Sequence, residues 1–242
     1  MPITNPQTGT RIDEIADGIY RIHTPITFPN GFSFNFNQYL TVDDQPVLFH
    51  TGLRNTFPLV AQAIATVMPL EKLAYVSFSH WEADESGALN ELLAAAPQAV
   101  PLCGQIAAMT TVNDAALRPA RVLQDNEALS IGKRTVRWFD APHVPHGWEC
   151  GFLGEDTTRT LFCGDLFTMP HADGGPLVEG DLLGPTEAFR KQMDYYAHGP
   201  NTRAVIEKLA AWKPATMGCM HGSAWRGDGE KLLRALANEV AP

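Results

Sequence analysis

The 242-residue sequence lacks the features that mark several common classes of protein. It has no cluster of Lys and Arg, and its formal net charge is −9, so we expect no nucleic-acid or anionic-membrane partner. It contains no run of about 18 apolar residues, and its first residues show no basic segment followed by an apolar one. These absences predict a cytoplasmic protein without a membrane span.

Cysteine is also scarce, with 4 residues and no CxxC pair. This spacing favours reduced, buried thiols over a disulfide framework. A hydrophobic content of 45% is enough for a substantial core, and no linker or low-complexity segment divides the chain. We therefore predict a single domain over residues 1–242.

Apolar runs with strand character alternate with segments of helical periodicity in each half of the chain. In the first half the predicted strands and helices cover Ile19–Ile22, Ser33–Val42, Pro46–Phe49, Phe57–Met68, Leu73–Ser79 and Gly87–Ala96. A second β-rich stretch follows, and helices are predicted at Glu187–Tyr196, Arg203–Trp212 and Gly229–Val240. Two halves that each run from strands to helices predict an α/β fold, a layered αββα sandwich.

The segment from Ser79 to Gly87 lies where a buried strand ends and a helix begins. Side chains at alternate positions of an extended segment point the same way, so His80, Glu82 and Asp84 could converge on one metal ion. A solvated acidic loop with a helix cap would explain these residues equally well.

Motifs at the predicted ends of later strands favour the metal site. His146, Asp165 and His221 each follow an apolar strand, and strand ends are where α/β proteins place their chemistry. A single histidine is usually an ordinary core or surface residue, but agreement among several strand ends is not expected by chance. Buried carboxylates need cations, and no Lys or Arg stands immediately beside these motifs, so we predict a dinuclear metal centre.

Together these motifs resemble those of the flavo-diiron proteins and the related stand-alone oxygen-binding di-iron proteins. The motifs are His80-x-Glu82-x-Asp84, His146, Asp165 within Leu-Phe-Cys-Gly-Asp, and His221-Gly-Ser-Ala-Trp-Arg. The similarity runs from about Ile15 to Leu236 in matching order. It implies the metallo-β-lactamase αββα sandwich.

The resemblance also implies a ligand set for two iron ions, as an Fe–O–Fe or Fe–peroxo–Fe centre. His80, Glu82 and His146 would hold one ion, and Asp84 and His221 the other, with Asp165 bridging the two. Zinc hydrolases of the same superfamily usually carry a second His where this chain has Glu82. Because an added carboxylate is a harder ligand that suits iron, we expect iron, with zinc as the alternative.

Two further residues are candidate catalytic groups. Glu85 stands where flavo-diiron proteins generally have His, so either Glu85 is a ligand or the second metal keeps an open position; a helix-dipole carboxylate is the other reading. His143 competes with His146 for one ligand role, and we prefer His146 for its spacing to Asp165. His143 is then a candidate to orient a ligand or deliver protons, or else a surface residue.

Flavo-diiron proteins carry a flavodoxin domain after this region, whereas the sequence stops at Pro242. We therefore expect no FMN and an external electron donor or signalling partner; the resemblance also implies a homodimer. The leading hypothesis is an O2-binding sensor, or an O2 or NO reductase when electrons are supplied. The alternatives are a dinuclear zinc hydrolase acting on an ester, thioester or lactone, and a structural domain with an empty site.

The aromatic segment at residues 28–36 has two interpretations. It could cover the site and keep it dry. It could equally be an ordinary strand that packs in the core, since alternating aromatic residues are common in strands.

Overall fold

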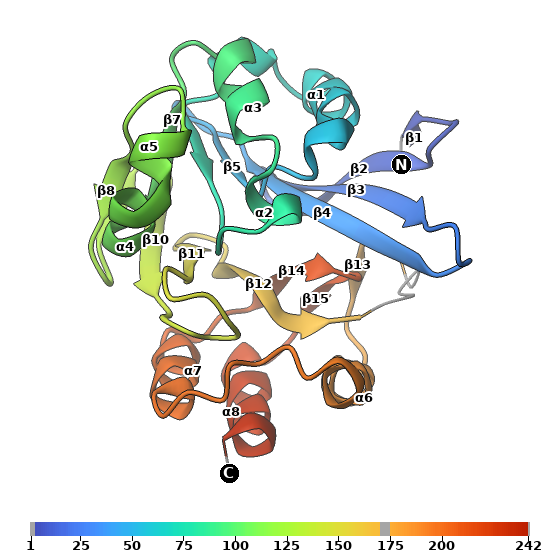
Figure 1. Cartoon of the computed structure of the whole chain (residues 1–242), viewed down its shortest axis with the longest axis vertical. Coiled ribbons are helices and arrows are strands. Elements are labelled where there is room, and N and C mark those ends of the chain that lie inside the picture. The colour runs from blue at the N-terminus through green and yellow to red at the C-terminus, as the bar shows by residue number, and fades with distance from the viewer. Residues whose placement is uncertain (1–2, 170–174, 242) are drawn as a thin grey trace.

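The computed structural model describes residues 3–169 and 175–241, and two β-sheets lie face to face at its centre (Figure 1). The first sheet has the order β1-β2-β3-β4-β5-β6-β7-β8. Its strands are β1 (Ile3–Asn5), β2 (Thr10–Ala16), β3 (Ile19–Thr27), β4 (Ser33–Thr41), β5 (Val47–Phe49), β6 (Tyr75–Ser77), β7 (Val100–Gly104) and β8 (Arg121–Leu123). Neighbours are antiparallel from β1 to β5 and parallel from β5 to β8.

The second sheet has the order β13-β15-β14-β12-β11-β10-β9. Its strands are β9 (Ala128–Ser130), β10 (Thr135–Asp140), β11 (Gly151–Glu155), β12 (Thr160–Thr168), β13 (Leu177–Val178), β14 (Thr216–His221) and β15 (Ala224–Arg226). The β12–β14 and β13–β15 pairs are parallel, and the others are antiparallel.

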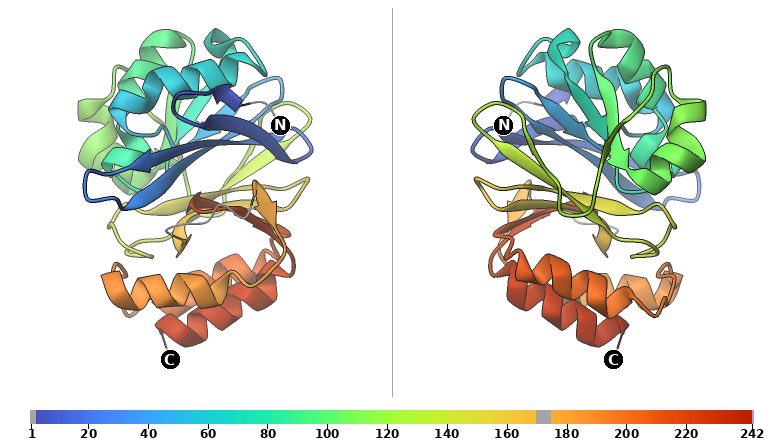
Figure 2. Two further views of the ribbon diagram at one scale, coloured as in Figure 1. Left: turned by 90° about the vertical axis from the view of Figure 1, so that its right-hand side faces the viewer. Right: turned by 90° about the vertical axis from the view of Figure 1, so that its left-hand side faces the viewer.

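Helices cover both outer faces of the paired sheets, as the side views show (Figure 2). The first sheet carries α1 (Phe57–Ala65), α2 (Ala83–Ser86), α3 (Leu89–Ala95), α4 (Gln105–Ala107) and α5 (Asn113–Ala115), with short turns η1 (Arg54–Thr56), η2 (Leu70–Lys72) and the π-helical η3 (Ala108–Val112). The second sheet carries α6 (Leu183–Met193), α7 (Thr202–Ala211) and α8 (Gly229–Val240). The predicted αββα order of layers is confirmed. No helix in the described ranges combines the length and apolarity needed to cross a bilayer.

Alternation along β4 assigns its side chains to two different layers. Tyr39 belongs to the apolar cluster between the sheets and lies 5.4 Å from the ring of Phe162. Leu40 belongs to the cluster beneath α1 and α3. Because successive strand residues point to opposite faces, Asn35 and Asn37 share the inter-sheet face with Tyr39.

Element boundaries differ from the predicted ones where local capping or chain bending intervenes. The helix predicted from Glu187 begins at Leu183, where the Asp181 side chain accepts a hydrogen bond from the Gly184 N–H at 3.1 Å. It ends at Asp194, whose φ of 50° is left-handed and stops the helix before Tyr196. The strand predicted over Leu73–Ser79 is shorter, at Tyr75–Ser77, and leaves room for the loop that carries His80.

Gly151 allows β11 to pass directly over the buried indole of Trp138. A methyl group at this position would overlap the indole ring, which is held by a 2.7 Å hydrogen bond from Nε1 to Asp140. We predict that Gly151→Ala lowers the free energy of unfolding by about 1 to 3 kcal/mol, as overpacking does elsewhere. Gly180→Ala is the control, since nothing lies near its added methyl group. Urea denaturation measures both, and equal midpoints would contradict the prediction.

Candidate metal centre

The loop after β6 and the first turn of α2 bring His80, Glu82, Asp84 and Glu85 to one edge of the first sheet. The expectation that residues 80–84 are extended throughout is wrong, because α2 begins at Ala83. Asp84 and Glu85 therefore point from a helical turn. Their convergence with His80 depends on the helix following directly after the loop.

The second sheet supplies His146, Asp165 and His221. His146 lies in the loop that follows β10, and His221 is the last residue of β14. Asp165 was predicted at a strand end, but it lies inside β12, which continues to Thr168. Gly164, at φ 49°, interrupts the register of β12 beside it, and this irregularity turns the strand at the site.

Three overlapping groups of side chains offer ligand atoms within 4.8 Å of one another among the described residues. They are His80, His146 and Asp165; His80, Glu82 and Glu85; and Asp84, Glu85 and His221. In the first half of the site the Nε2 atoms of His80 and His146 are 2.9 Å apart. The Oε1 atom of Glu82 lies 3.2 Å from Nε2 of His146.

Asp165 lies between the two halves of the site. Its Oδ2 atom is 3.8 Å from Nε2 of His80 and 3.9 Å from Nε2 of His146, whereas its Oδ1 atom is 3.4 Å from Nε2 of His221. Asp84 faces the same His221 nitrogen at 3.4 Å. One carboxylate therefore faces both groups of imidazoles with different oxygens.

Each imidazole of the site is oriented through its Nδ1 atom. His146 Nδ1 donates to the carbonyl of Tyr195 at 2.8 Å, and His221 Nδ1 donates to the carbonyl of Asn35 at 2.8 Å. The partner carbonyl fixes the tautomer in both, so the Nε2 lone pair faces the centre. No sequence pattern points to Tyr195, because its contribution is a backbone carbonyl.

His80 is oriented by a short chain that includes His50. Nδ1 of His80 and Nε2 of His50 each lie 2.9 Å from the Ser79 hydroxyl. Burial holds the pKa of His50 well below its usual value, so His50 is neutral and can accept the Ser79 hydroxyl proton. Ser79 can then accept from Nδ1–H of His80, which again leaves Nε2 free.

The side chains of this site fit cations. Both carboxylate oxygens of Glu85 and the Oδ1 atom of Asp165 are buried and make no hydrogen bond within the described chain. Buried carboxylate oxygens without donors are costly unless a cation faces them. Two imidazole nitrogens at 2.9 Å, both with lone pairs toward the centre, also need an electron-pair acceptor.

Comparison with protein-family models identifies the lineage of the chain. The model described as ODP family beta lactamase matches residues 34–222, a range that contains every candidate ligand. The chain belongs to this family. Members of the family share the metallo-β-lactamase fold, which agrees with the layered architecture described above.

Relatives of this ODP-family chain are longer redox proteins. It is 26% identical over 215 residues to the rubredoxin-oxygen oxidoreductase of Megalodesulfovibrio gigas, covering 79% of this chain and 49% of the relative. It is 26% identical over 212 residues to the anaerobic nitric oxide reductase flavorubredoxin of Salmonella arizonae, covering 82% of this chain and 43% of the relative. The chain therefore spans less than half the length of these two relatives.

A solved structure with the same fold is a metal-soaked flavodiiron core from Synechocystis. It superposes with a TM-score of 0.78 at 21% sequence identity, over 96% of this chain and 61% of that one. At this identity the likeness establishes the fold, and the function must be inferred from the site itself.

Glu85 is the most electrostatically strained group of the ODP-family site. Burial, followed by the neighbouring charge of Asp165, raises its pKa well above the usual range. In contrast, in the metal-free protein, where the imidazoles can carry a proton on Nε2, hydrogen bonds from His146 and His80 lower the pKa of Glu82. Burial alone would raise the pKa of Asp84, but the hydrogen bond and the charge of His221, with smaller contributions from neighbouring groups, together outweigh it and lower the value to about 2. Unlike Glu82 and Asp84, Glu85 thus has no histidine hydrogen bond that lowers its pKa.

His143, the other candidate catalytic residue, lies apart from the three groups. It is exposed, has a φ of 65°, and donates its backbone N–H to the carbonyl of Gly147. None of the candidate metal groups in the described residues contains it. The structure brings together the other predicted site residues, including Glu85, whereas His143 is exposed and stands outside the three groups.

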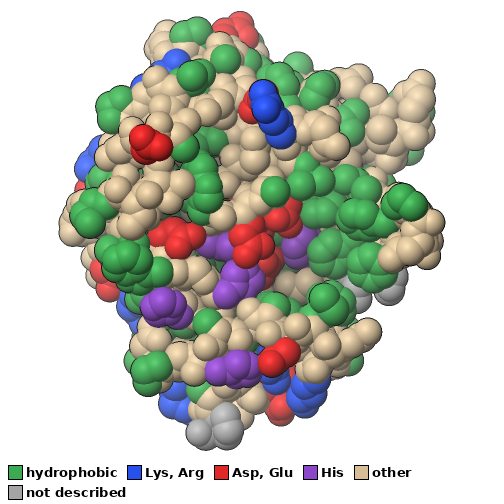
Figure 3. All heavy atoms as spheres, in the orientation of Figure 1, with side chains coloured by type: hydrophobic (Ala, Val, Ile, Leu, Met, Phe, Trp, Pro, Cys, Tyr) green, Lys and Arg blue, Asp and Glu red, His purple; other side chains and the backbone are tan. Residues whose placement is uncertain are grey.

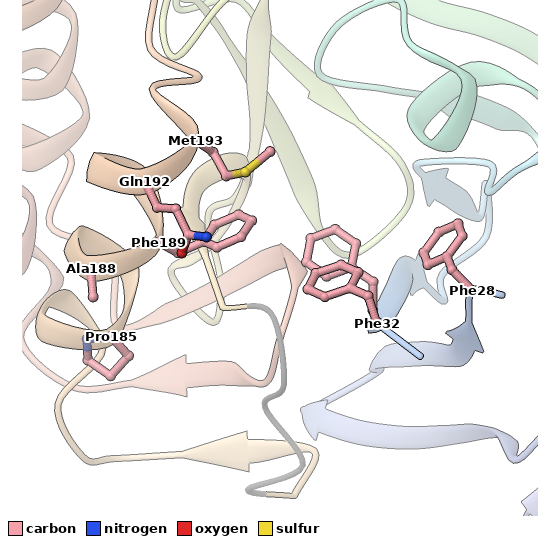
Figure 4. A pocket seen from close by; sticks show the side chains of 8 residues that line it. Phe28, Phe32, Pro185, Ala188, Phe189, Gln192 and Met193 are labelled. Atoms are coloured by element: carbon pink, nitrogen blue, oxygen red, sulfur yellow. The ribbon is translucent and has the colours of Figure 1, made fainter. Parts of the chain in front are cut away.

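An apolar wall adjoins the His221 half of the site. Acidic and histidine side chains gather in the middle of one face, with hydrophobic side chains beside them (Figure 3). A cavity of about 850 Å³ there is lined by Phe28, Phe32, Phe34, Pro185, Ala188, Phe189, Gln192 and Met193 (Figure 4). The Phe34 ring stacks on His221 with centroids 4.1 Å apart. Within residues 28–36, Phe36 is buried, as the core-packing interpretation requires, whereas Phe28 is 39% exposed.

The two histidines of the loop after β10 provide a matched pair for testing the ligand assignment. We predict that His146→Ala removes or strongly weakens one metal ion, because an Nε2 donor is lost beside His80 and Glu82. His143→Ala should leave the metal content unchanged, because this side chain is exposed and belongs to none of the groups found among the described residues. Metal analysis of the purified variants measures both. Loss of metal in His143→Ala but not in His146→Ala would reverse the assignment.

Removing the charge of Glu85 should have opposite effects on the metal-free and metal-loaded protein. Because the pKa of Glu85 is raised in the folded protein, the metal-free fold loses stability as pH rises above the usual glutamate pKa of 4.5, where the unfolded carboxyl ionises. We predict that Glu85→Gln raises the unfolding free energy of the metal-free protein by about 1 to 3 kcal/mol at pH 7 and has little effect at pH 4. The same substitution should weaken metal binding. Denaturation at both pH values and metal titration would show this, and a loss of metal-free stability at pH 7 would refute it.

Proposed function

We propose that this chain forms a non-haem di-iron centre that binds O2 or NO and passes electrons to the bound gas. The observation that carries the proposal is the position of Asp165, whose two oxygens face the imidazoles of separate halves of one buried site. A carboxylate in this position can bridge a pair of metal ions.

Ligand chemistry supports iron over zinc. Carboxylates from Glu82, Asp84, Glu85 and Asp165 meet the imidazoles of His80, His146 and His221. Oxygen-rich, hard ligands with some imidazole suit iron that changes oxidation state. Glu82 is the specific difference from the His-rich pattern usual in zinc hydrolases.

In the proposed arrangement His80, Glu82 and His146 hold one ion, while Asp84 and His221 hold the other. Asp165 lies between them, and Glu85 belongs to candidate groups on both sides. Iron supplies the electrons that pass to the gas. The protein holds each Nε2 toward the centre, through the carbonyls of Tyr195 and Asn35 and through Ser79.

The apolar wall favours binding of a small uncharged ligand. O2 and NO are apolar, and the rings of Phe34 and Phe189, 6.1 Å apart, line the approach to His221. Such rings exclude water from one flank of the site without offering competing ligands. The relatives named for oxygen and nitric oxide reduction point to the same ligand class.

Reduction of O2 to water takes more electrons than a pair of ferrous ions holds. The proposal therefore includes an external electron donor for turnover. Without one, the chain should react once with O2 and then stop, which is the behaviour of a binding protein or sensor.

The test is to load the metal-free protein with ferrous iron under anaerobic conditions and mix it with O2. We expect two irons per chain and a visible absorption change that decays slowly, with little continuous O2 consumption when a chemical reductant is added alone. His143→Ala should behave as the wild type, and His221→Ala should lose the change. Three results together would instead establish the hydrolase. They are zinc as the metal of the isolated protein, zinc-dependent hydrolysis of an ester, thioester or lactone, and an iron form that does not react with O2.

A further inference from the structure

The backbone around His221 is held from the opposite sheet. On β4, Asn37 donates from Nδ2 to the carbonyl of Cys219 at 2.9 Å and to that of Gly222 at 2.7 Å. The Tyr39 hydroxyl donates to the same Cys219 carbonyl at 2.6 Å. These bonds hold the backbone at Cys219 and Gly222, before and after His221.

Asn35 and Arg21 complete this set of contacts. The Oδ1 atom of Asn35 accepts from the Gly222 N–H at 2.9 Å, while its carbonyl accepts from Nδ1 of His221 at 2.8 Å. Arg21, on β3, donates from Nη2 to the Gly222 carbonyl at 2.7 Å. The Gly222 peptide thus bonds side chains from two strands of the first sheet.

The ladder of the second sheet is irregular where it meets this turn. The parallel pairing of β14 with β12 is irregular from Gly164 to Thr168, the part that ends opposite His221. Gly222 has a φ of 95°, a conformation that turns the chain out of β14. Because His221 sits between an irregular ladder and a turn, its position depends on the contacts that reach across from β3 and β4.

Burying the polar side chains that make these bonds costs free energy by itself. Arg21 and Asn37 are both 0% exposed, and Asn35 is 5% exposed. Polar side chains inside a domain are retained at low cost only where their hydrogen bonds are satisfied. Here the amides of Asn35 and Asn37 bond the backbone of Cys219 and Gly222, close to His221 on either side, whereas Arg21 has partners only at Nη2 among the described residues.

We propose that Arg21, Asn35 and Asn37 are positioning residues that set His221 for the metal ion it shares with Asp84 and Glu85. This inference rests on the proposed metal centre, but it depends neither on the identity of the metal nor on gas binding. The competing explanation is a purely structural one, in which the same bonds only join the two sheets.

Gln38 provides a matched control for Asn37. It is the next residue on β4 and is 1% exposed, but it points to the opposite face of the sheet, where its amide lies near Gly52. Asn37→Leu and Gln38→Leu each replace one buried amide on the same strand. Only Asn37→Leu removes donors to the turn that carries His221.

The experiment titrates Co²⁺ into the metal-free full-length chain and follows its absorption and the shifted imidazole N–H resonances. We expect the wild type and Gln38→Leu to take up a pair of cobalt ions. Asn37→Leu should weaken the ion beside His221 by about 10- to 100-fold, as loss of groups that orient ligands does elsewhere, and should displace the His221 N–H resonance. The ion beside His80 and His146 should be bound as in the wild type. Chemical denaturation of the metal-free variants measures how much stability each loses, and we expect the smaller loss in Gln38→Leu, because the Gln38 amide makes no hydrogen bond in the described part of the chain.

Cobalt binding and spectra of Asn37→Leu identical to those of the wild type would overturn the proposal, as would equal loss of the same ion in Gln38→Leu. If Asn37→Leu does not fold, Asn35→Ala is the second variant, because it removes the bonds to Gly222 but keeps the backbone carbonyl that accepts from His221. Its expected outcome is the same selective weakening. A wild-type chain that binds no cobalt beside His221 would overturn both this inference and the metal centre, whereas normal cobalt binding with an iron form inert to O2 would overturn the proposed function alone.

Discussion

Repulsion among buried carboxylates is the constraint on which the architecture of this site depends. Glu82, Asp84 and Glu85 come from one loop and helix of the first sheet, and Asp165 comes from the second. Folding brings these groups together, and water screens the buried Glu85 and Asp165 less than it screens Glu82, whose side chain is 53% exposed. The raised pKa of Glu85 shows that the surrounding imidazoles do not compensate fully. Metal ions would supply the missing positive charge, so metal binding and stability of this region are coupled.

The ligand side chains can meet at the centre only if the two sheets keep a fixed position relative to each other. His221 lies at the end of a strand whose pairing has become irregular, and its ring and backbone are held from β3 and β4. His146 is held from the carbonyl of Tyr195, in the segment between α6 and α7. The imidazoles are therefore oriented by elements distant in sequence, and a shift of one sheet against the other would separate the ligand groups.

In the proposed function, the apolar wall and the polar centre would have separate roles in gas binding. Phe34 contacts His221 directly, yet it also lines the cavity shared with α6. Asn35 and Asn37, which hold the turn after His221, follow Phe34 along the same strand. One strand thus carries the apolar flank of the site at one end and the polar support of a ligand further along.

The sequence by itself determined the layered fold, from the alternation of strand and helix patterns, and identified the residues able to bind metal. Ligand types such as His80 and Asp165 can be recognised locally, because imidazole and carboxylate chemistry belongs to the side chain. Only the tertiary structure decided the helical placement of Asp84 and Glu85, the position of Asp165 inside β12, and the exposure of His143. It also decided the roles of the Tyr195 carbonyl and of the buried amides of Asn35 and Asn37. These depend on which groups meet across the two sheets, and contacts between distant segments follow from packing of the whole chain, which no local pattern of residues specifies.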